Sequence, residues 1–290
     1  MYQRILIGVD FSDSSIETVR WAVSRFPSAD LVLFHCIERF SVPGYLVREL
    51  GEQLDLLEEK ELDVRTNLEH IAERLGIDVR YDIRHGWTPE ALQLAAAEHD
   101  SELVVVGAHR QRTSPTDELG QTSAAIVRKS EIPVLVWRPV RAEKDKTIVA
   151  ALDLREGSAP VAEIAAAYAD YFKTRLVLLH AMPSTLQAYM RAVSSPAKVE
   201  EAIERIEGRA REEALASVPA DMRKRLQVQP SIVRGRPIDA HILNAAEAEH
   251  ADLIVIGKAH APGLKGRVLL GGTTSRVIRG ANCSVLTVPL

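Results

Sequence analysis

The 290-residue sequence predicts an α/β protein with two tandem domains, each a five-stranded parallel sheet flanked by helices. Two observations lead to this prediction. Short apolar segments alternate with segments of helical periodicity along the whole chain, which is typical of a parallel sheet covered on both faces. The order of these segments also occurs twice, and an internal repeat of this length indicates a duplicated domain.

The repeat is clear from the apolar segments of the two halves. Residues 31–36 (LVLFHC), for example, resemble residues 176–181 (LVLLHA). The spacing between matched positions rises slowly along the chain, as small loop insertions after a duplication would produce. We therefore predict domain 1 over residues 1–140 and domain 2 over residues 147–290, joined by a short charged linker.

The elements of domain 1 follow from local patterns. Strands are predicted where apolar residues run together, and helices where apolar residues recur every three or four positions. Ser14 and Glu17 form an S-x-x-E pattern, which predicts a capping box at the first helix. The predicted strands are 5–9, 31–35, 79–83, 103–106 and 134–137, and the predicted helices are 16–26, 54–75, 89–98 and 123–129.

Domain 2 repeats this order. The predicted strands are 148–152, 176–180, 228–233, 253–256 and 285–288, and the predicted helices are 158–172, 198–217, 237–249 and 275–279. Right-handed crossovers between such elements give a doubly wound sheet. Ligands bind such sheets at the carboxyl ends of the strands, so the residues after strands one, two and four are the candidates.

Composition restricts the function classes. A net charge of −4 gives no indication of nucleic-acid or anionic-membrane binding. Two cysteines in the chain are not a disulfide framework and favour a reducing compartment. The amino-terminal residues lack the apolar run of a signal peptide, and no segment has the length of a membrane span. We therefore expect a cytoplasmic protein.

Two polar residues recur after the first and second strands. Asp10 and Asp153 each follow an apolar run directly, where a carboxylate either accepts hydrogen bonds from a ligand or caps the next helix. Both interpretations stay open, because a duplication copies caps as well as sites. His35 and His180 end the second strands, and we expect them to be packed, hydrogen-bonded residues rather than catalytic groups.

A glycine-bearing loop follows the fourth strand of each domain. One glycine ends the strand and another opens the next helix: Gly107 and Gly120 in domain 1, Gly257 and Gly271 in domain 2. Glycine can adopt left-handed backbone angles and approach a ligand closely, and the amides at a helix N-terminus can hold phosphate. The alternative is a surface loop in which the glycines only make turns.

Charge distinguishes the two loops. The loop of domain 1 sets arginines against acids, whereas the loop of domain 2 carries cations without acids. The charged residues are Arg110, Arg112, Asp117 and Glu118 in domain 1, and Lys258, Lys265 and Arg267 in domain 2. The hydroxyl groups of Thr273, Thr274 and Ser275 add further donors in domain 2. Domain 2 is therefore predicted to be the better anion site.

Together these features resemble the universal stress protein domain. In that family a strand ending in Asp precedes an L-V-L-x-H strand, and a G-x2-G-x9-G-[ST] motif follows the fourth strand. The closing segment at residues 274–289, TSRVIRGANCSVLTVP, is also similar to the family's pattern. The resemblance covers essentially the whole chain twice. It implies two Rossmann-like domains of the adenine nucleotide alpha hydrolase-like type, with ATP or AMP as the implied ligand.

Both copies depart from the family's phosphate motif. Arg110 stands at the middle glycine of domain 1, and Gln121 replaces its Ser/Thr. In domain 2, His260 stands at the middle glycine and Gly272 at the Ser/Thr position. Left-handed angles cost a non-glycine residue roughly 1–2 kcal/mol, and a lost hydrogen bond to a charged phosphate costs about 1.5–3 kcal/mol. Both changes together would weaken a micromolar site by about two to three orders of magnitude.

The resemblance implies ligand contacts in both domains, with binding retained in domain 2 at best. In domain 2 the contacts are Asp153, Gly257, His260, Gly263, Lys265, Gly271, Gly272, Thr273 and Thr274. In domain 1 they are Asp10, Gly107, Arg110, Gly120, Gln121 and Thr122.

The sequence is compatible with three functions. The leading one is a non-catalytic stress-response protein that senses a small ligand, ATP or AMP, or serves a protein partner. The second is a nucleotide-independent interaction scaffold. The third is an enzyme such as a slow ATPase, but the sequence contains neither G-x4-GK[ST] nor G-x-S-x-G. No metal site is expected, because no cysteine pair or acidic cluster accompanies the histidines.

The fifth strands suggest how the domains associate. Family members commonly pair through this strand, which corresponds to residues 134–137 and 285–288 here. Unpaired, each would leave an apolar sheet edge, which proteins usually cover. We expect the two domains of the chain to pair in this way, and a homodimer of the whole chain is a further expectation.

Overall fold

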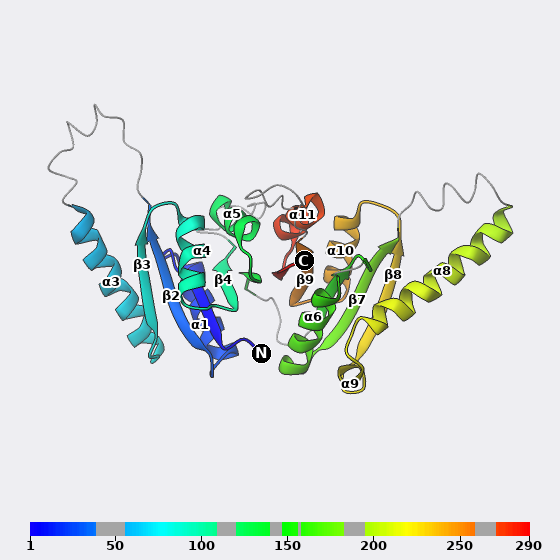
Figure 1. The fold of residues 1–290 in the computed structure, drawn as a ribbon, viewed down its shortest axis with the longest axis horizontal. Coiled ribbons are helices and arrows are strands. Elements are labelled where there is room, and N and C mark those ends of the chain that lie inside the picture. The colour runs from blue at the N-terminus through cyan, green and yellow to red at the C-terminus, as the bar shows by residue number, and fades with distance from the viewer. Residues whose placement is uncertain (39–55, 109–119, 140–146, 156–157, 183–194, 259–270) are drawn as a thin grey trace, which may run out of the picture. The chain divides into compact units, whose positions relative to one another are not determined.

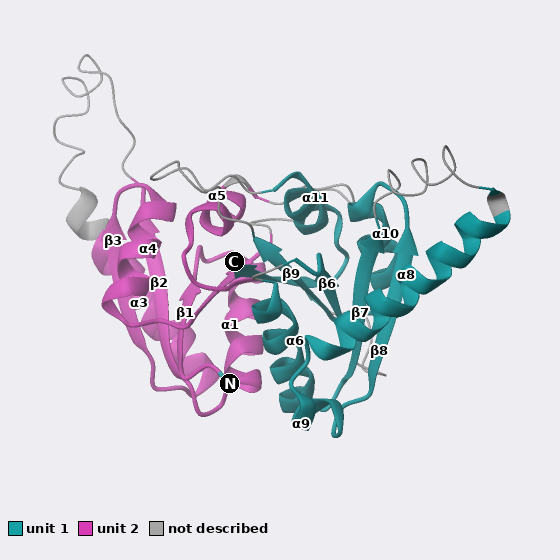
Figure 2. Ribbon diagram, turned by 45° about the vertical axis from the view of Figure 1, so that its right-hand side comes forward, with its two compact units in different colours: residues 1, 138–290 teal, residues 2–137 magenta. Residues whose placement is uncertain are grey.

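The computed structural model describes residues 1–38, 56–108, 120–139, 147–155, 158–182, 195–258 and 271–290. It divides into two compact units, residues 2–137 and residues 138–290 with residue 1, coloured separately in Figure 2. We refer to them as domain 1 and domain 2. Each is a parallel sheet flanked by helices, which confirms the predicted fold class (Figure 1).

Domain 1 contains five strands and four helices in the residues described. They are β1 (Arg4–Gly8), α1 (Asp13–Arg25), β2 (Asp30–Ile37), α3 (Leu56–Leu75), β3 (Arg80–His85), α4 (Thr88–Glu98), β4 (Leu103–Gly107), α5 (Gln121–Lys129) and β5 (Val134–Trp137). The strands lie in the order β3-β2-β1-β4-β5, and every neighbouring pair is parallel. The order reverses beside β1, which is the switch point where ligands bind such sheets.

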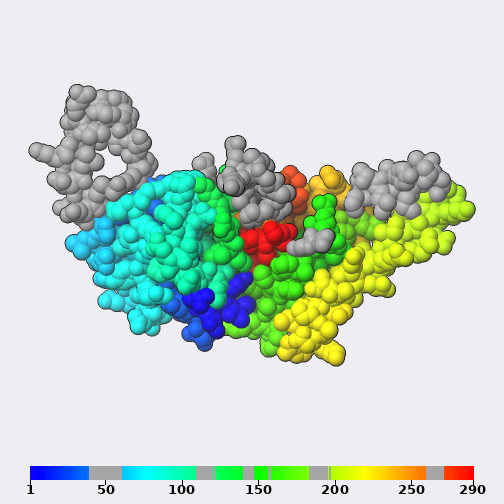
Figure 3. All heavy atoms as spheres, viewed as in Figure 1, coloured from blue at the N-terminus to red at the C-terminus, as the bar shows by residue number. Residues whose placement is uncertain are grey.

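Domain 2 repeats this arrangement. Its elements are β6 (Thr147–Leu152), α6 (Ala159–Phe172), β7 (Arg175–Met182), α8 (Pro196–Ala216), α9 (Ala220–Arg223), β8 (Val228–Arg234), α10 (Ile238–Ala248), β9 (Leu253–Lys258), α11 (Gly272–Gly280) and β10 (Ser284–Pro289). The order β10-β9-β6-β7-β8 is again fully parallel. The short helix α9 was not predicted; it lies with α8 at the domain surface, in yellow and lime in Figure 3.

The strand registers establish which residues of the two domains correspond. Ile5 pairs with Leu103 in domain 1, and Ile148 pairs with Leu253 in domain 2. Matched strand positions are therefore 143 residues apart in β1 and β6 and 150 apart in β4 and β9. These strands are apolar because both faces are buried, and equivalent residues such as Leu33 and Leu178 have no exposed surface.

Helices cover the sheet of domain 1 on both faces. A Cβ atom added at Gly107 would lie 3.3 Å from the Ser14 hydroxyl in α1. The neighbouring strand residue, Val106, points the other way, because side chains alternate along a strand. Val106 and Leu92 of α4 both lie within 4 Å of a Cβ added at Gly8. Helices α1 and α4 therefore lie on opposite faces, and α5 packs beside α4.

The predicted capping box at Ser14 and Glu17 is wrong. The N-cap of α1 is Ser12, whose hydroxyl oxygen accepts a hydrogen bond from the amide of Ser15 at 3.2 Å. Ser14 lies inside the first turn, and its carbonyl accepts from the Thr18 hydroxyl at 2.7 Å. The helix begins earlier than the sequence pattern suggested, because Ser12 already offers a cap in an extended conformation.

All three tryptophans of the chain belong to domain 1. Trp21 lies edge-on to Phe26, with 5.8 Å between ring centroids, and 6.5 Å from the buried ring of Trp137. Trp87, by contrast, is 48% exposed, with the Lys129 ammonium 4.1 Å from its ring centroid. Trp137 therefore belongs to the core, Trp21 is half-buried beside it, and Trp87 lies at the surface where α4 begins.

None of the described helices combines the length and apolar character needed to span a membrane.

Candidate functional site

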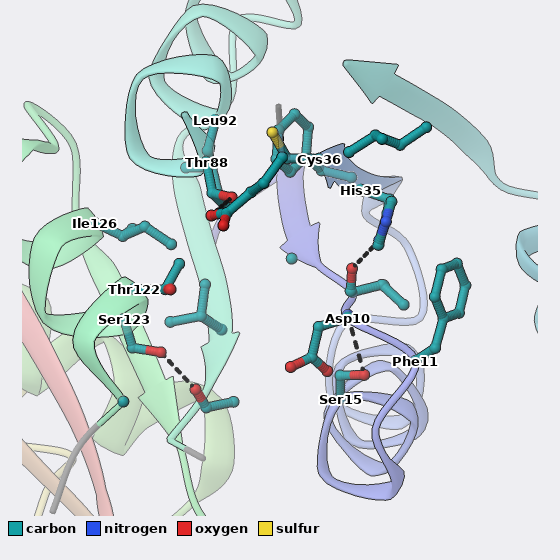
Figure 4. Close-up of a pocket in the computed structure, with 18 of the residues that line it drawn as sticks. Asp10, Phe11, Ser15, His35, Cys36, Thr88, Leu92, Thr122, Ser123 and Ile126 are labelled. Atoms are coloured by element: carbon teal, nitrogen blue, oxygen red, sulfur yellow. Dashed lines mark hydrogen bonds between the residues drawn. The ribbon is translucent and has the colours of Figure 1, made fainter. Parts of the chain in front are cut away.

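Domain 1 contains a cavity of about 550 Å³ at the carboxyl ends of β1, β2 and β4 (Figure 4). Its walls come from the segment after β1, the end of β2, helices α3 and α4, and the start of α5. This is the place where the strand order reverses. In domain 1 the cavity therefore lies after strands one, two and four, where the sequence predicted a site.

A tight turn after β1 forms one wall. One carboxylate oxygen of Asp10, Oδ1, accepts hydrogen bonds from the amide of Ser12 at 3.1 Å and from its hydroxyl at 2.5 Å. Phe11, between them, has a left-handed backbone with a φ of 62°. The carboxylate therefore holds the turn that precedes α1, but it is not the helix cap that the capping interpretation expected, because the N-cap is Ser12. Asp10 is also exposed and lines the cavity.

His35 is packed and hydrogen-bonded, as predicted. Its Nδ1 lies 2.7 Å from the carbonyl oxygen of Val9, so Nδ1 carries the proton, because a carbonyl only accepts. The ring lies 4.6 Å from the ring of Phe11, with an angle of 35° between the planes. His180 of domain 2 makes the same bond, with 2.9 Å from Nδ1 to the Leu152 carbonyl.

The start of α5 forms the opposite wall. Gly120, Thr122 and Ser123 line the cavity, and the first intrahelical hydrogen bond runs from Ala124 to Gly120. The preceding amides of the first turn have no intrahelical acceptor and are available to an anion. The Ser123 hydroxyl instead donates to the carbonyl of Gly107 at 2.9 Å.

The described motif glycines are not left-handed, contrary to the expectation. Gly120 and Gly271 have φ angles of −53° and −54°, and neither Gly107 nor Gly257 has a positive φ. The space around Gly257 explains that residue better, since a Cβ atom there would lie 2.7 Å from Leu290 Cδ1. Close packing rather than backbone angle favours glycine at this position.

Sequence reasoning missed part of the cavity wall. Glu38 and Asp63 line it together with Asp10, and the described lining contains neither lysine nor arginine. The Thr88 hydroxyl donates to Glu38 Oε1 at 2.6 Å. The rule that marks strand ends could have found Glu38. Asp63 lies in α3, far from any strand end, and no sequence signal places it here.

Cys36 also lines the cavity, with its thiol donating to the carbonyl of Gly86 at 3.5 Å. Burial raises the pKa of the Cys36 thiol, and the nearby Glu38 carboxylate raises it further, whereas a hydrogen bond with Thr88 lowers it. The net effect keeps the thiol protonated at neutral pH, so it is not an activated nucleophile.

Domain 2 builds the same framework. Asp153 Oδ1 accepts from the amide of Arg155 at 3.2 Å, and Leu154 between them has a φ of 53°. The Thr274 hydroxyl donates to the Gly257 carbonyl at 3.0 Å, as Ser123 does in domain 1. The expectation that Thr274 supplies a phosphate donor is wrong, because this proton is already donated and the residue is 5% exposed.

The side chains around this framework differ between the domains. The strand and helix registers match Phe11 with Leu154, Cys36 with Ala181, Thr88 with Ile238 and Ala108 with Lys258. Lys258 was predicted to be a loop cation. It is instead the last residue of β9, with 1% of its surface exposed.

The remaining predicted contacts are distributed as follows. Gly272 begins α11 beside the guanidinium of Arg276, and Thr273 follows it, half-buried. Arg110, His260, Gly263 and Lys265 lie outside the described residues, as does the side chain of Gln121. Within the described ranges, no group of three or more histidine, cysteine or acidic residues is arranged to hold a metal ion.

Comparisons with known proteins identify the family. The sequence model of the universal stress protein family matches residues 1–138 and again residues 145–289. A universal stress protein of Mycolicibacterium smegmatis is 28% identical over 296 aligned residues, covering 98% of this chain and 96% of that protein.

Solved structures agree on the fold. A universal stress protein from Archaeoglobus fulgidus has a TM-score of 0.69 at 16% identity, covering 99% of this chain and 98% of its own. A functionally unknown protein from Pseudomonas aeruginosa has a TM-score of 0.62 at 18% identity, covering 99% and 92%. These two likenesses support the fold, and the two family matches cover nearly the whole sequence. The chain belongs to the universal stress protein family.

Proposed function

We propose that this universal stress protein is a non-catalytic ligand sensor that binds ATP or AMP, and that domain 1 holds the principal site. The observation that carries the proposal is the cavity of about 550 Å³ at the switch point of domain 1. Its volume lies within the roughly 300–1,000 Å³ typical of small-ligand sites. Family membership adds the class of ligand.

Two walls of this cavity suit the two ends of a nucleotide. The amides at the start of α5 and the partial positive charge of the helix N-terminus favour a phosphate beside Gly120. Across the cavity, Asp10 uses Oδ1 to hold its own turn and lines the cavity with an exposed carboxylate. A carboxylate in this position can accept a hydrogen bond from a ribose hydroxyl.

The proposal reverses the ranking that charge alone gave. Domain 2 was favoured for its cations and glycines, but His260 and Lys265 lie outside the described residues. Lys258, where domain 1 has the small Ala108, is buried at the end of its strand rather than presented by a loop. Ligand binding by domain 2 therefore stays a prediction.

A nucleotide-independent scaffold is the second candidate. It is favoured by the three carboxylates Asp10, Glu38 and Asp63, which line the cavity without a described lysine or arginine. Like charges weaken the binding of a polyanion at short range. This acidity opposes ATP more strongly than AMP, so the two ligands should be compared directly.

Isothermal titration of ATP and AMP into the full chain tests the proposal, with Gly120→Val and Gly271→Val as matched variants. Both glycines have ordinary φ angles and no atom within 3.5 Å of an added Cβ, so valine should leave the fold intact. We expect Gly120→Val to weaken binding more than about ten-fold by crowding the phosphate end, and Gly271→Val to leave it unchanged.

If Gly271→Val weakened binding and Gly120→Val left it unchanged, the ligand site would be assigned to domain 2 instead. No binding to the wild-type chain at millimolar ligand would favour the scaffold. Incubation with ATP followed by chromatography tests the non-catalytic role, because a steady release of ADP that Gly120→Val abolishes would make the protein an ATPase.

A further inference from the structure

We infer that Phe11, supported by the imidazole of His35, is the residue that selects an aromatic base in the cavity of domain 1. This inference rests on the proposed function and adds to it the part of the ligand that domain 1 recognises. The two rings come from neighbouring segments, the turn after β1 and the end of β2. Both line the cavity, across from Thr122 and Ser123 in Figure 4.

The position of Phe11 is fixed by its backbone. Asp10 Oδ1 accepts from the amide of Ser12, which closes the turn around Phe11 and holds its φ at 62°. A bulky residue with positive φ is a genuine outlier, and such residues concentrate at ligand sites. The turn therefore fixes the direction in which the Phe11 side chain leaves the backbone, beside the cavity.

The imidazole of His35 packs against the Phe11 ring. The hydrogen bond from its Nδ1 to the Val9 carbonyl, 2.7 Å long, sets the orientation of the imidazole. The phenyl ring of Phe11 packs against it with 4.6 Å between centroids. Phe11 is nevertheless only half-buried and lines the cavity, so part of its ring is open to a ligand.

Domain 2 provides an internal control for this arrangement. It has the same turn, with Asp153 bonded to the amide of Arg155, and the same histidine contact, from His180 to Leu152. The residue within the turn is Leu154, with a φ of 53°. The framework is therefore common to both domains, and only domain 1 adds an aromatic ring to it. Leucine is evidently compatible with this backbone.

Stacking against an aromatic side chain contributes to the binding of any flat heteroaromatic base, but not to the binding of a sugar phosphate. Replacing an aromatic side chain that stacks on a base weakens binding roughly 5- to 150-fold. The predicted selectivity is thus for a nucleotide over the same molecule without its base. Phe11 acts through contact with the ligand, and His35 acts by positioning Phe11.

The test compares AMP with ribose 5-phosphate by titration into the wild-type chain and the Phe11→Leu, Phe11→Tyr and Leu154→Phe variants. We expect Phe11→Leu to weaken the binding of AMP at least about five-fold and to leave the binding of ribose 5-phosphate unchanged. Phe11→Tyr should keep the AMP affinity. In NMR spectra of bound AMP, the base protons should shift upfield by the ring current in the wild-type chain and lose that shift in Phe11→Leu.

An unchanged AMP affinity and an unchanged base-proton shift in Phe11→Leu would overturn the inference. Equal weakening of AMP and ribose 5-phosphate would overturn it as well, because that result indicates a structural role. If AMP binding is lost in Gly120→Val but unaffected by Phe11→Leu, the proposed function stands and the inference fails. If the wild-type chain binds neither ATP nor AMP, both fail. Tighter AMP binding by Leu154→Phe supports the inference from domain 2.

Discussion

After its first strand, each domain makes the same left-handed turn from different residues. An aspartate closes the turn in both, and the residue inside it is Phe11 in domain 1 and Leu154 in domain 2. The backbone and its hydrogen bonds are retained, while the side chain inside the turn differs. After the duplication, the two domains thus share the backbone turn and its hydrogen bonds. The chemical character of each turn depends on the side chain inside it, Phe11 or Leu154.

The third strand shows a second difference of this kind. It ends in His85 in domain 1, with Nε2 3.0 Å from Glu61 of α3. The matched residue of domain 2 is Arg234, which pairs with Glu207 and Glu200 of α8. Hydrogen bonds from Arg234 hold the pKa of Glu207 below its usual value. The same helix-to-sheet contact thus uses the guanidinium of an arginine in domain 2 and the imidazole of a histidine in domain 1.

The largest expected effect tests whether the domains are energetically separate. Leu33 and Leu178 are equivalent core residues without exposed surface, so truncation to alanine should cost about 3–5 kcal/mol in the domain that contains each. Urea unfolding of Leu33→Ala and Leu178→Ala measures this cost. Leu178→Ala should also keep the wild-type ATP affinity. Loss of ATP binding in Leu178→Ala would show that domain 1 depends on domain 2.

Ligand should stabilise one domain only. A ligand at 100 times its dissociation constant stabilises the state that binds it by about 2.7 kcal/mol. Differential scanning calorimetry with ATP should therefore raise the unfolding temperature of domain 1 and leave that of domain 2 unchanged. Gly120→Val is the control, since it should remove the shift. A shift in domain 2 instead would contradict the assignment of the site.

Acid should weaken the hydrogen bonds to the Asp82 carboxylate of domain 1, a residue whose match in domain 2 is not acidic. Partial burial raises the pKa of Asp82, but hydrogen bonds from Arg84 at 2.7 Å and His99 at 2.9 Å lower it more, so the net pKa lies below its ordinary value. The stabilisation is therefore complete above the unfolded-state pKa of about 3.9 and is lost as the pH falls through the folded-state pKa. The matched residue of β8 is Ser231.

Asp82→Asn should lower the unfolding free energy of domain 1 by about 1–2 kcal/mol at pH 7, and by less near pH 3. Urea unfolding at both pH values measures the difference. Ser231→Ala should change stability by less than about 0.5 kcal/mol at either pH. An Asp82→Asn effect that is independent of pH would mean that packing, rather than charge, is what the carboxylate contributes.

The smallest effect concerns the surface contact of Lys129. Its ammonium lies 4.1 Å from the Trp87 ring centroid and 2.7 Å from Glu90, and both partners are substantially exposed. Exposed cation–π and ion-pair contacts are each weak, so Lys129→Met should cost less than about 1 kcal/mol in urea unfolding. A larger loss would mean that this contact, absent at the matched Gly280 of domain 2, holds α4 and α5 together.

The sequence predicted the strands well because burial on both faces leaves a strong local signal. Residues such as Leu31, Val104 and Ile254 lie in uninterrupted apolar runs, and each is buried in a strand. Helix starts were harder, because Ser12 and Ser14 are both chemically suitable caps and only the backbone conformation decides between them. The duplication itself was readable because it preserved the order of these runs.

The candidate site was only partly predictable. Strand ends located Asp10 and Gly107, because topology alone brings them together. Asp63 could not be predicted, because it lines the cavity from helix α3, and no local sequence pattern indicates how that helix packs. Phe11 was missed for a different reason: its left-handed backbone depends on a hydrogen bond between the residues on either side of it, not on its own preference.

The placement of the tryptophans has a practical consequence. Trp21, Trp87 and Trp137 all lie in domain 1, so intrinsic indole fluorescence reports on this domain alone. The buried ring of Trp137 should emit at short wavelength and shift to the red when domain 1 unfolds. Trp87 precedes Thr88, a residue of the cavity wall, so a ligand that moves this wall should change its emission. The unmodified chain thus carries its own optical label on one of its two domains.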